Sequence, residues 1–268
     1  MDIIQAVILG LIQGLTEFLP VSSSGHLVLG KLLFGVKVDN IIFEVFVHFA
    51  TFLAVVAFFF REIVILIKAP LRYVFVNDRS RETVNFSKYV LFIAVGTIPA
   101  VIVGLYFKED IEQAFSSARL VGMTLLVTTA LLFLTALVKP KREGLRFLDG
   151  ILIGLAQALA ILPGISRSGA TISTAMYLGV DKSTAFKFSF LLSLPAIFGA
   201  FILQLKDALE IGLPKDQIYI YLAGMLCAFI SGYVCLVILR KIVIAGKFAW
   251  FGVYTLIIGV LTLVFAHG

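Results

Sequence analysis

The stretch QGLTEFLPVSSSGH, residues 13–26, interrupts an otherwise apolar beginning of the chain. An apolar helical run over residues 3–15 reaches the carboxylate of Glu17 and breaks at Pro20. Three serines, a glycine and a histidine follow before a second apolar run starts at Leu27. Non-helical backbone at membrane depth survives only where protein buries it or a water-filled cavity wets it. Because ionisable residues at that depth mark functional sites, this stretch predicts one.

The composition places this stretch in a polytopic membrane protein. Of 268 residues, 60% are hydrophobic and 14% are charged, with a mean hydropathy of +1.07, whereas soluble domains carry about 25% charged residues. The net charge of +6 comes from basic residues between apolar spans, which indicate topology and not nucleic-acid binding. The first charge is Asp2, so we expect no cleaved signal peptide. Cys227 and Cys235 share one apolar span and are expected to be inert buried thiols.

Two kinds of apolar segment can be distinguished by length. A membrane crossing takes about 20 apolar residues, and six segments qualify: residues 41–60, 87–107, 118–138, 184–205, 217–239 and 248–266. Residues 2–34 and 148–179 instead each contain two short apolar helices separated by a break rich in Ser, Gly and Pro. The sequence therefore predicts an all-α integral membrane protein with six transmembrane helices and two re-entrant helix-loop-helix hairpins.

The two hairpins resemble each other in sequence. ILGLIQGL, residues 8–15, aligns with LIGLAQAL, residues 152–159, and the same offset aligns SSSG at 22–25 with SRSG at 166–169. We predict two repeats, residues 1–140 and 141–268, each a hairpin followed by three crossings. Three is odd, so the second repeat must be inverted relative to the first, as in other membrane proteins built from broken helices.

Lysines and arginines are unevenly distributed between the two sides of this topology. Most lie in the segments 61–88, 139–146, 182–187 and 240–247, which fall on one side. The positive-inside rule makes that side cytoplasmic. Both termini are then expected outside, with the first hairpin entering from outside and the second from the cytoplasm. Their polar tips should meet inside the bundle.

Each tip feeds the N-terminus of a helix, where free N–H groups and the helix dipole favour anions. The first tip offers three serine hydroxyls. The second offers hydroxyls and a guanidinium, whose planar fork suits phosphate, at Ser166, Arg167, Ser168 and Thr171. The first tip adds a carboxylate at Glu17 and an imidazole at His26. A hydroxyl nucleophile, a base and a cation together are the components of phosphoryl transfer.

Structural interpretations of these residues stand beside the functional one. Serines, glycines and prolines at a broken helix can serve only to satisfy freed backbone groups. Glu44 and His48 are spaced i, i+4 and share a helix face, so they form either an interior structural pair or a support for the pocket. Pro99 and Pro195 are expected to kink their helices.

The motifs resemble those of the bacterial undecaprenyl-diphosphatase family, the bacitracin-resistance proteins. The resemblance rests on Glu17 with PVSSSGH at 20–26 and on PGISRSGAT at 163–171, and it extends over the whole chain. It implies removal of the terminal phosphate from a C55 isoprenoid diphosphate, which recycles the lipid carrier for cell-wall synthesis and confers bacitracin resistance. It also implies the bacterial plasma membrane and a divalent cation, and it leaves a homodimer open as the assembly.

Carried over by residue, the family's acidic motif falls on Gln13 and Glu17, where some members have Glu at the first position. The serine–histidine motif falls on Ser22, Ser23 and His26, and the basic motif on Ser166, Arg167 and Ser168. We expect Glu17, Ser23, His26 and Arg167 to be catalytic. The expected phosphate ligands are Ser22, Ser24, Gly25, Ser166, Arg167, Ser168 and Thr171.

The expected mechanism is attack by Ser23 with His26 as its base; His26 as nucleophile, or as base for a water, is the alternative. Mg²⁺ or Ca²⁺ would bridge Glu17 and the diphosphate, with Gln13 at most a neutral ligand through its amide oxygen. The site should open outward. A polyprenyl-phosphate flippase is the competing function, because inverted repeats are typical of transporters. The type-2 phosphatidic-acid phosphatases are disfavoured, since their Lys-rich and later Arg/His/Asp motifs are missing.

Overall fold

The computed structural model describes residues 1–34, 41–211 and 217–265, which are helical apart from short links and contain no β-strand. The helices in chain order are α1 (Ile3–Phe18), α2 (Ser23–Phe34), α3 (Ile41–Phe58), α4 (Phe60–Phe75), α5 (Arg81–Tyr106), α6 (Lys108–Ala114), α7 (Ala118–Leu134), α8 (Phe147–Leu159), α9 (Arg167–Tyr177), α10 (Lys182–Ile211), α11 (Ile218–Ile244) and α12 (Phe251–Phe265). Single turns of 3₁₀ helix, η1 (Thr135–Leu137) and η3 (Phe248–Trp250), extend α7 and precede α12.

Five helical segments of the described ranges are long and apolar enough to cross a membrane: Arg81–Tyr106, Ala118–Leu137, Lys182–Lys206, Ile218–Ile244 and Phe248–Phe265. Helices α3 and α4 form a sixth candidate as a pair bent by 76°. The five single helices and α3 of the bent pair each lie on a segment predicted to cross, and the prediction of an all-α membrane protein is confirmed.

The sequence predicts a crossing that ends at residue 60. The structure instead continues with helix α4, which is bent by 76° from α3. Ser80 caps α5 by accepting a hydrogen bond from the Thr83 N–H at 3.3 Å, and Asp78 holds the turn that precedes it. The carboxylate of Asp78 accepts hydrogen bonds from the Ser80 N–H (3.0 Å) and the Thr83 hydroxyl (2.9 Å) and pairs with Arg72 (2.7 Å). The hydrogen bonds from Ser80 and Thr83 lower the pKa of Asp78 to about 2. These contacts hold the turn in place.

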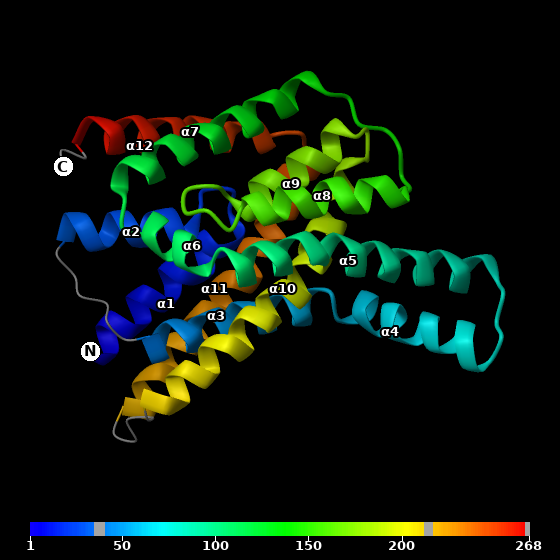
Figure 1. Ribbon diagram of the computed structural model, residues 1–268, viewed down its shortest axis with the longest axis horizontal. Helices are drawn as coiled ribbons and strands as arrows, with labels where there is room; N and C mark the ends of the chain where they lie inside the picture. The colour runs from blue at the N-terminus through cyan, green and yellow to red at the C-terminus, as the bar shows by residue number, and fades with distance from the viewer. Residues whose placement is uncertain (35–40, 212–216, 266–268) are drawn as a thin grey trace.

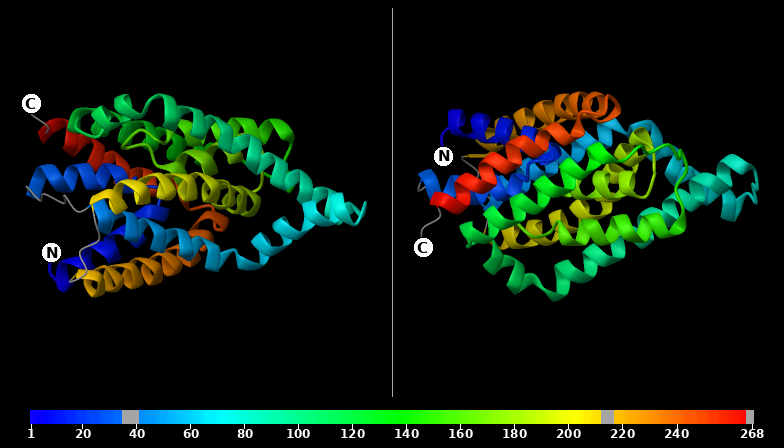
Figure 2. Two further views of the ribbon diagram at one scale, coloured as in Figure 1. Left: turned by 60° about the horizontal axis from the view of Figure 1, so that its bottom comes forward. Right: turned by 90° about the horizontal axis from the view of Figure 1, so that it is seen from above.

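The two hairpins, α1–α2 and α8–α9, run into the bundle from opposite ends (Figure 1). Helix α12 ends at the same end of the molecule at which α1 begins, and the α4–α5 hairpin projects from the other end (Figures 1 and 2). The first helix of each hairpin lies along a long helix of the other repeat, α1 on α11 and α8 on α5.

Close backbone contacts join the helices in these two pairs. A Cβ on Gly10 would lie 2.2 Å from the carbonyl oxygen of Gly224, and a Cβ on Gly154 would lie 2.2 Å from that of Gly96. Small residues at helix contacts in membranes let backbones approach in this way. Gly10 and Gly154 are equivalent positions of the sequence repeat, so the two contacts correspond.

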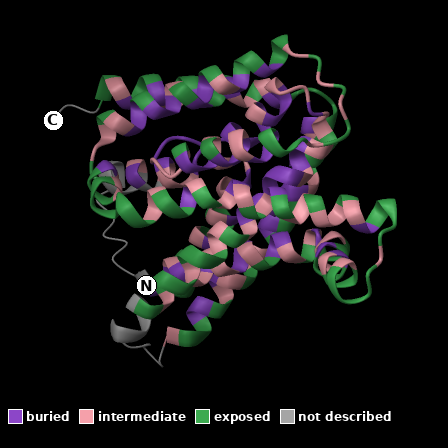
Figure 3. Ribbon diagram, turned by 45° about the vertical axis from the view of Figure 1, so that its right-hand side comes forward, coloured by how far each residue is buried: buried purple, intermediate pink, exposed green. Residues whose placement is uncertain are grey.

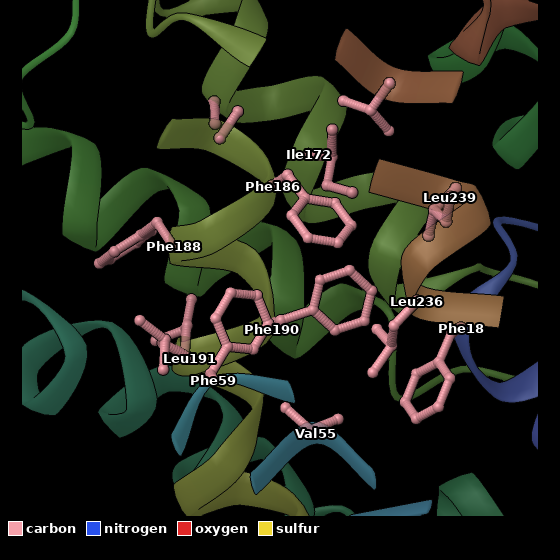
Figure 4. Close-up of a cluster of buried hydrophobic side chains, with 14 of the residues drawn as sticks. Phe18, Val55, Phe59, Ile172, Phe186, Phe188, Phe190, Leu191, Leu236 and Leu239 are labelled. Carbon is pink, nitrogen blue, oxygen red and sulfur yellow. The ribbon is translucent and has the colours of Figure 1, made fainter. Parts of the chain in front are cut away.

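A core of aromatic and aliphatic side chains fills the bundle on the side of the hairpin tips toward the α4–α5 end. Phe59, Phe186 and Phe190 lie together there, with Phe18 of α1 beside them (Figure 4). The outward faces of the long helices are instead exposed and rich in Leu, Ile, Val and Phe (Figure 3). Such a surface is suited to lipid, which explains why so apolar a chain leaves it uncovered.

Candidate active site

The first tip is a sharp turn between α1 and α2. Ser22 lies at its centre with φ at 65°, in the left-handed region that a serine adopts at a cost of about 1–2 kcal/mol. Its hydroxyl accepts a hydrogen bond from the Gly25 N–H at 3.2 Å and so caps α2. Backbone in such a conformation is characteristic of functional sites, where surrounding contacts maintain it.

The second tip is held by threonines of α7. The hydroxyl of Thr124 donates to the carbonyl of Pro163, and that of Thr128 donates to the carbonyl of Gly164 at 2.8 Å. Thr128 also accepts from the Ser166 N–H at 3.0 Å. Ser166 in turn caps α9 by accepting from the Gly169 N–H at 3.1 Å. The polar groups of the broken backbone are therefore largely satisfied by protein.

The two tips meet, as predicted. The Gly164 N–H donates to the Ser22 hydroxyl at 3.1 Å, so one serine connects both tips. Ser23 and Arg167 are the first residues of α2 and α9, and they occupy equivalent positions of the repeat. The two helix N-termini consequently bring a hydroxyl and a guanidinium to one place.

Glu17 is the centre of the polar cluster. Its Oε1 accepts from Nη2 of Arg167 at 2.9 Å. Its Oε2 accepts from the Gln13 amide at 2.9 Å and from the Ser23 hydroxyl at 3.0 Å. His48 of α3 hydrogen-bonds the Gln13 amide through Nδ1 (3.1 Å), which lies 3.7 Å from Glu17. The Glu17 side chain is only 10% exposed, so these contacts act in a largely desolvated setting.

His26 does not lie in this cluster, so the expected pairing of Ser23 with His26 is not formed. Its Nδ1 contacts the Ser22 carbonyl at 2.8 Å and its Nε2 contacts the Tyr254 hydroxyl at 2.7 Å, with the two rings stacked. A carbonyl can only accept, so Nδ1 carries a proton and the neutral ring accepts from Tyr254 through Nε2. Both ring nitrogens are therefore occupied, because α2 turns this side chain toward α12 and away from Glu17.

The structure also locates the expected phosphate ligands. Ser24 lies beside Ser22, with their hydroxyls 3.2 Å apart, and the Ser166 and Ser168 hydroxyls are 3.3 Å apart. Thr171 is fully buried and donates to the Arg167 carbonyl at 2.7 Å. Ser22, Ser166, Ser168 and Thr171 are all buried, and Ser22 and Ser166 serve as helix caps. Among these residues Arg167 alone lines the cavity described next.

A cavity of about 600 Å³ opens beside the cluster. Glu17, His48 and Arg167 form its polar end. The remaining wall comes from the C-terminal parts of α5, α8 and α10 and is mostly apolar, including Ala100, Gly104, Ile161, Gly199 and Phe201. The cavity thus combines a charged end with a hydrocarbon-like wall.

The described residues do not fit a resident metal site. Among them no three His, Cys, Asp or Glu side chains are grouped as metal ligands. Both carboxylate oxygens of Glu17 already accept hydrogen bonds, and Gln13 presents its NH₂ group to the site. A hard cation needs several oxygen ligands, and here the neighbours of the carboxylate are donors. The expected cation remains a prediction, in which it would arrive with a diphosphate.

The sequence alone does not identify two residues of the site, His48 and Tyr254. His48 was open between a structural and a supporting role, and the structure places it at the site. Tyr254 lies 228 residues from His26. It is one of several aromatic residues in apolar segments, and no motif distinguishes it.

Comparison with known proteins gives one consistent result. The family model described as Bacitracin resistance protein BacA matches residues 6–261. A protein named undecaprenyl-diphosphatase from Carboxydothermus hydrogenoformans is 41% identical over 98% of this chain and 97% of its own length. Relatives of the same name from Desulforapulum autotrophicum (41% identical, 98% of each chain) and, as undecaprenyl-diphosphatase 3, from Bacillus anthracis (39%, covering 98% and 97%) agree.

Proposed function

This chain belongs to the bacitracin resistance protein BacA family, and we propose that the cluster around Glu17 performs that family's reaction. The enzyme hydrolyses undecaprenyl diphosphate to undecaprenyl phosphate and inorganic phosphate, and so provides the lipid carrier of cell-wall synthesis and bacitracin resistance. The single observation that supports the assignment of the site is the convergence of Ser23 and Arg167 on one carboxylate, only 10% exposed, at the end of an apolar cavity.

The cavity suits an amphipathic substrate. The polyprenyl chain would lie against the apolar walls of α5, α8 and α10 and leave between them into lipid, while the diphosphate reaches Glu17, His48 and Arg167. Arg167 is held by Glu17 at 2.9 Å before substrate arrives. A bound phosphate would share that guanidinium, whose charge stabilises the charge that develops in the transition state.

Ser23 is the proposed nucleophile, and the geometry favours Glu17 over His26 as its base. The Ser23 hydroxyl donates directly to Glu17. Oγ attacks the terminal phosphorus while its proton passes to Glu17. The bond from phosphorus to the bridging oxygen breaks, and the undecaprenyl phosphate leaves with that proton. Water then attacks the phosphoserine; Glu17 takes a proton from the water and returns one to Oγ as inorganic phosphate is released.

His26 is proposed as a positioning residue. It binds the carbonyl of Ser22, the residue with positive φ, and is itself braced by Tyr254. Holding Ser22 in this conformation fixes the start of α2 and hence the direction of the neighbouring Ser23 hydroxyl. His26 as nucleophile, or as base for water, requires its ring to leave both partners.

The orientation proposed is that of the sequence analysis. Both termini and the mouth of the cavity would lie outside a bacterial plasma membrane, and the basic α4–α5 hairpin inside. The cavity is lined by the C-terminal parts of α5 and α10, which lie at the end of the molecule where α1 begins (Figure 1). That distribution supports access from the end of the molecule at which α1 begins.

Covalent trapping tests the mechanism directly. A brief incubation with diphosphate labelled in its terminal phosphate, followed by acid quench, should leave an acid-stable phosphoserine. Ser23→Ala should lower turnover by about 10³-fold and Glu17→Gln by about 10²-fold or more. An acid-labile, alkali-stable adduct would identify His26 as the nucleophile instead. Active Ser23→Ala enzyme without any adduct would leave direct attack by water.

The flippase remains a second candidate, favoured by the matching contacts of α1 with α11 and α8 with α5. Movement of a fluorescent polyprenyl phosphate across vesicles containing the Ser23→Ala protein would support it. Phosphate release from wild-type protein in detergent, with no lipid movement in vesicles, would exclude it for this chain.

A further inference from the structure

Gln157 of α8 is the repeat counterpart of Gln13, but its surroundings are different. Four residues after Gln13 comes Glu17, which accepts a hydrogen bond from the Gln13 amide. Four residues after Gln157 comes Ile161, whose side chain has no polar atom. The Gln157 amide therefore has no partner of this kind on its own helix.

The only hydrogen bond that the Gln157 side chain makes with described residues has a long donor–acceptor distance. Its Nε2 donates to the Leu192 carbonyl of α10 at 3.5 Å, the outer limit of a hydrogen bond. Its Oε1 is buried and has no partner among the described residues. The whole residue is 3% exposed and lies in the wall of the cavity that contains Glu17 and Arg167.

A buried acceptor without a donor destabilises a fold, and an apolar residue would fill a purely structural wall better. Serving as an acceptor for a ligand explains why such a group lines the same cavity as Glu17, His48 and Arg167. A carboxamide oxygen accepts hydrogen bonds and repels anions, so the ligand atom must carry a hydrogen. Phosphate groups lose their second proton near pH 6 and carry an O–H below it.

We infer that Gln157 is a substrate-binding residue whose Oε1 accepts a hydrogen bond from the protonated oxygen of the terminal phosphate. The inference rests on the proposed function and names the ionic form of the diphosphate that the site prefers. Arg167 binds the charged oxygens of that group, and Gln157 binds its O–H. Of the two glutamines related by the repeat, Gln13 would then hydrogen-bond the Glu17 carboxylate, and Gln157 would hydrogen-bond the substrate.

Binding without turnover provides the test, using the Ser23→Ala protein in detergent and a C15 prenyl diphosphate as probe. Adding Gln157→Met, which keeps the length and removes both polar atoms, should weaken binding about tenfold near pH 5.5 and less than about twofold near pH 8. Gln113→Met, an exposed glutamine on α6 outside the cavity, is the matched control and should change neither value.

Thermal unfolding shows whether Gln157 binds substrate or only stabilises the packing of α8 against α10. The Gln157→Met protein should unfold at the same temperature or higher, because the unpaired acceptor is gone. A lower unfolding temperature with unchanged binding would show that Gln157 only braces α10 and would overturn the inference. An equal loss of binding at both pH values would indicate an ordered water as the donor and would overturn it too. If Ser23→Ala protein bound no diphosphate at any pH, the proposed function itself would fail.

Discussion

At the residue scale, a variant of His26 can separate its two possible roles, which are positioning of the Ser22 carbonyl and proton transfer. His26→Asn places an amide N–H near the position of Nδ1 and can still donate to the Ser22 carbonyl, but it has no titratable group. We expect His26→Asn to remain within about tenfold of wild type and His26→Ala to lose about 10²-fold. The measurement is kcat for phosphate release from a C55 diphosphate across pH.

Tyr254→Phe provides the companion variant, since it removes the hydroxyl that braces the ring. It should lower kcat only a few-fold and leave the shape of the pH profile unchanged. If His26→Asn were as inactive as His26→Ala, and if the acidic limb of the pH profile of kcat were lost, His26 would be restored as base or nucleophile.

The same residues show how far the sequence could predict the site. Glu17 and Arg167 stand out by residue type at the two hairpin tips, whereas Ser23 is singled out among three serines by the family resemblance, and the structure brings all three together. The pairing of Ser23 with His26 was inferred from closeness along the chain. Three residues into α2, however, the helix points His26 toward α12, and a direction set by φ at Ser22 cannot be read from composition.

At the element scale, the wall of α10 contains an unfilled position. A Cβ on Gly199 would meet no atom within 4 Å, and Gly199 lines the cavity. Gly199→Leu should therefore fill space that the polyprenyl chain uses without disturbing the packing. We expect KM for a C55 diphosphate to rise at least about tenfold with little change in unfolding temperature, since several buried methylenes of substrate would lose their place.

Gly144→Leu is the matched control, because its Cβ also meets nothing within 4 Å but lies in an exposed link away from the cavity. It should leave KM unchanged. An unchanged KM in Gly199→Leu would show that the chain binds elsewhere, whereas a large fall in unfolding temperature would show that the position is packed in the membrane.

Element positions were predicted well because two physical signals coincide in this chain. Apolar length gave the crossings, and breaks of Ser, Gly and Pro gave the hairpins. Helix α4 was not predicted because its charged residues, Arg61, Glu62, Lys68 and Arg72, leave its apolar run too short for a crossing. The contacts of Gly10 with Gly224 and of Gly154 with Gly96 were also out of reach. A sequence repeat shows which segments are equivalent but not which ones meet.

At the scale of the whole molecule, function depends on which end of the bundle faces outward. The cavity is lined by the ends of α5 and α10, near α6, while the α4–α5 turn carries Arg72, Arg79 and Arg81 at the opposite end. The positive-inside rule predicts that the basic turn faces the cytoplasm. The polar head of a substrate would then be captured from the outer leaflet.

Cysteine labelling on intact cells decides this orientation. After replacement of Cys227 and Cys235 by serine, single cysteines would be introduced at Glu109 of α6 and at Arg79, both exposed. A membrane-impermeant thiol reagent should label Glu109→Cys and spare Arg79→Cys, while both react after the membrane is permeabilised. Each variant must retain phosphate release, so that labelling reports a native fold. The reverse pattern would turn the cavity to the cytoplasm. The enzyme would then act on diphosphate in the inner leaflet, because the C-terminal parts of α5 and α10 that line the cavity lie at the same end of the bundle as α6.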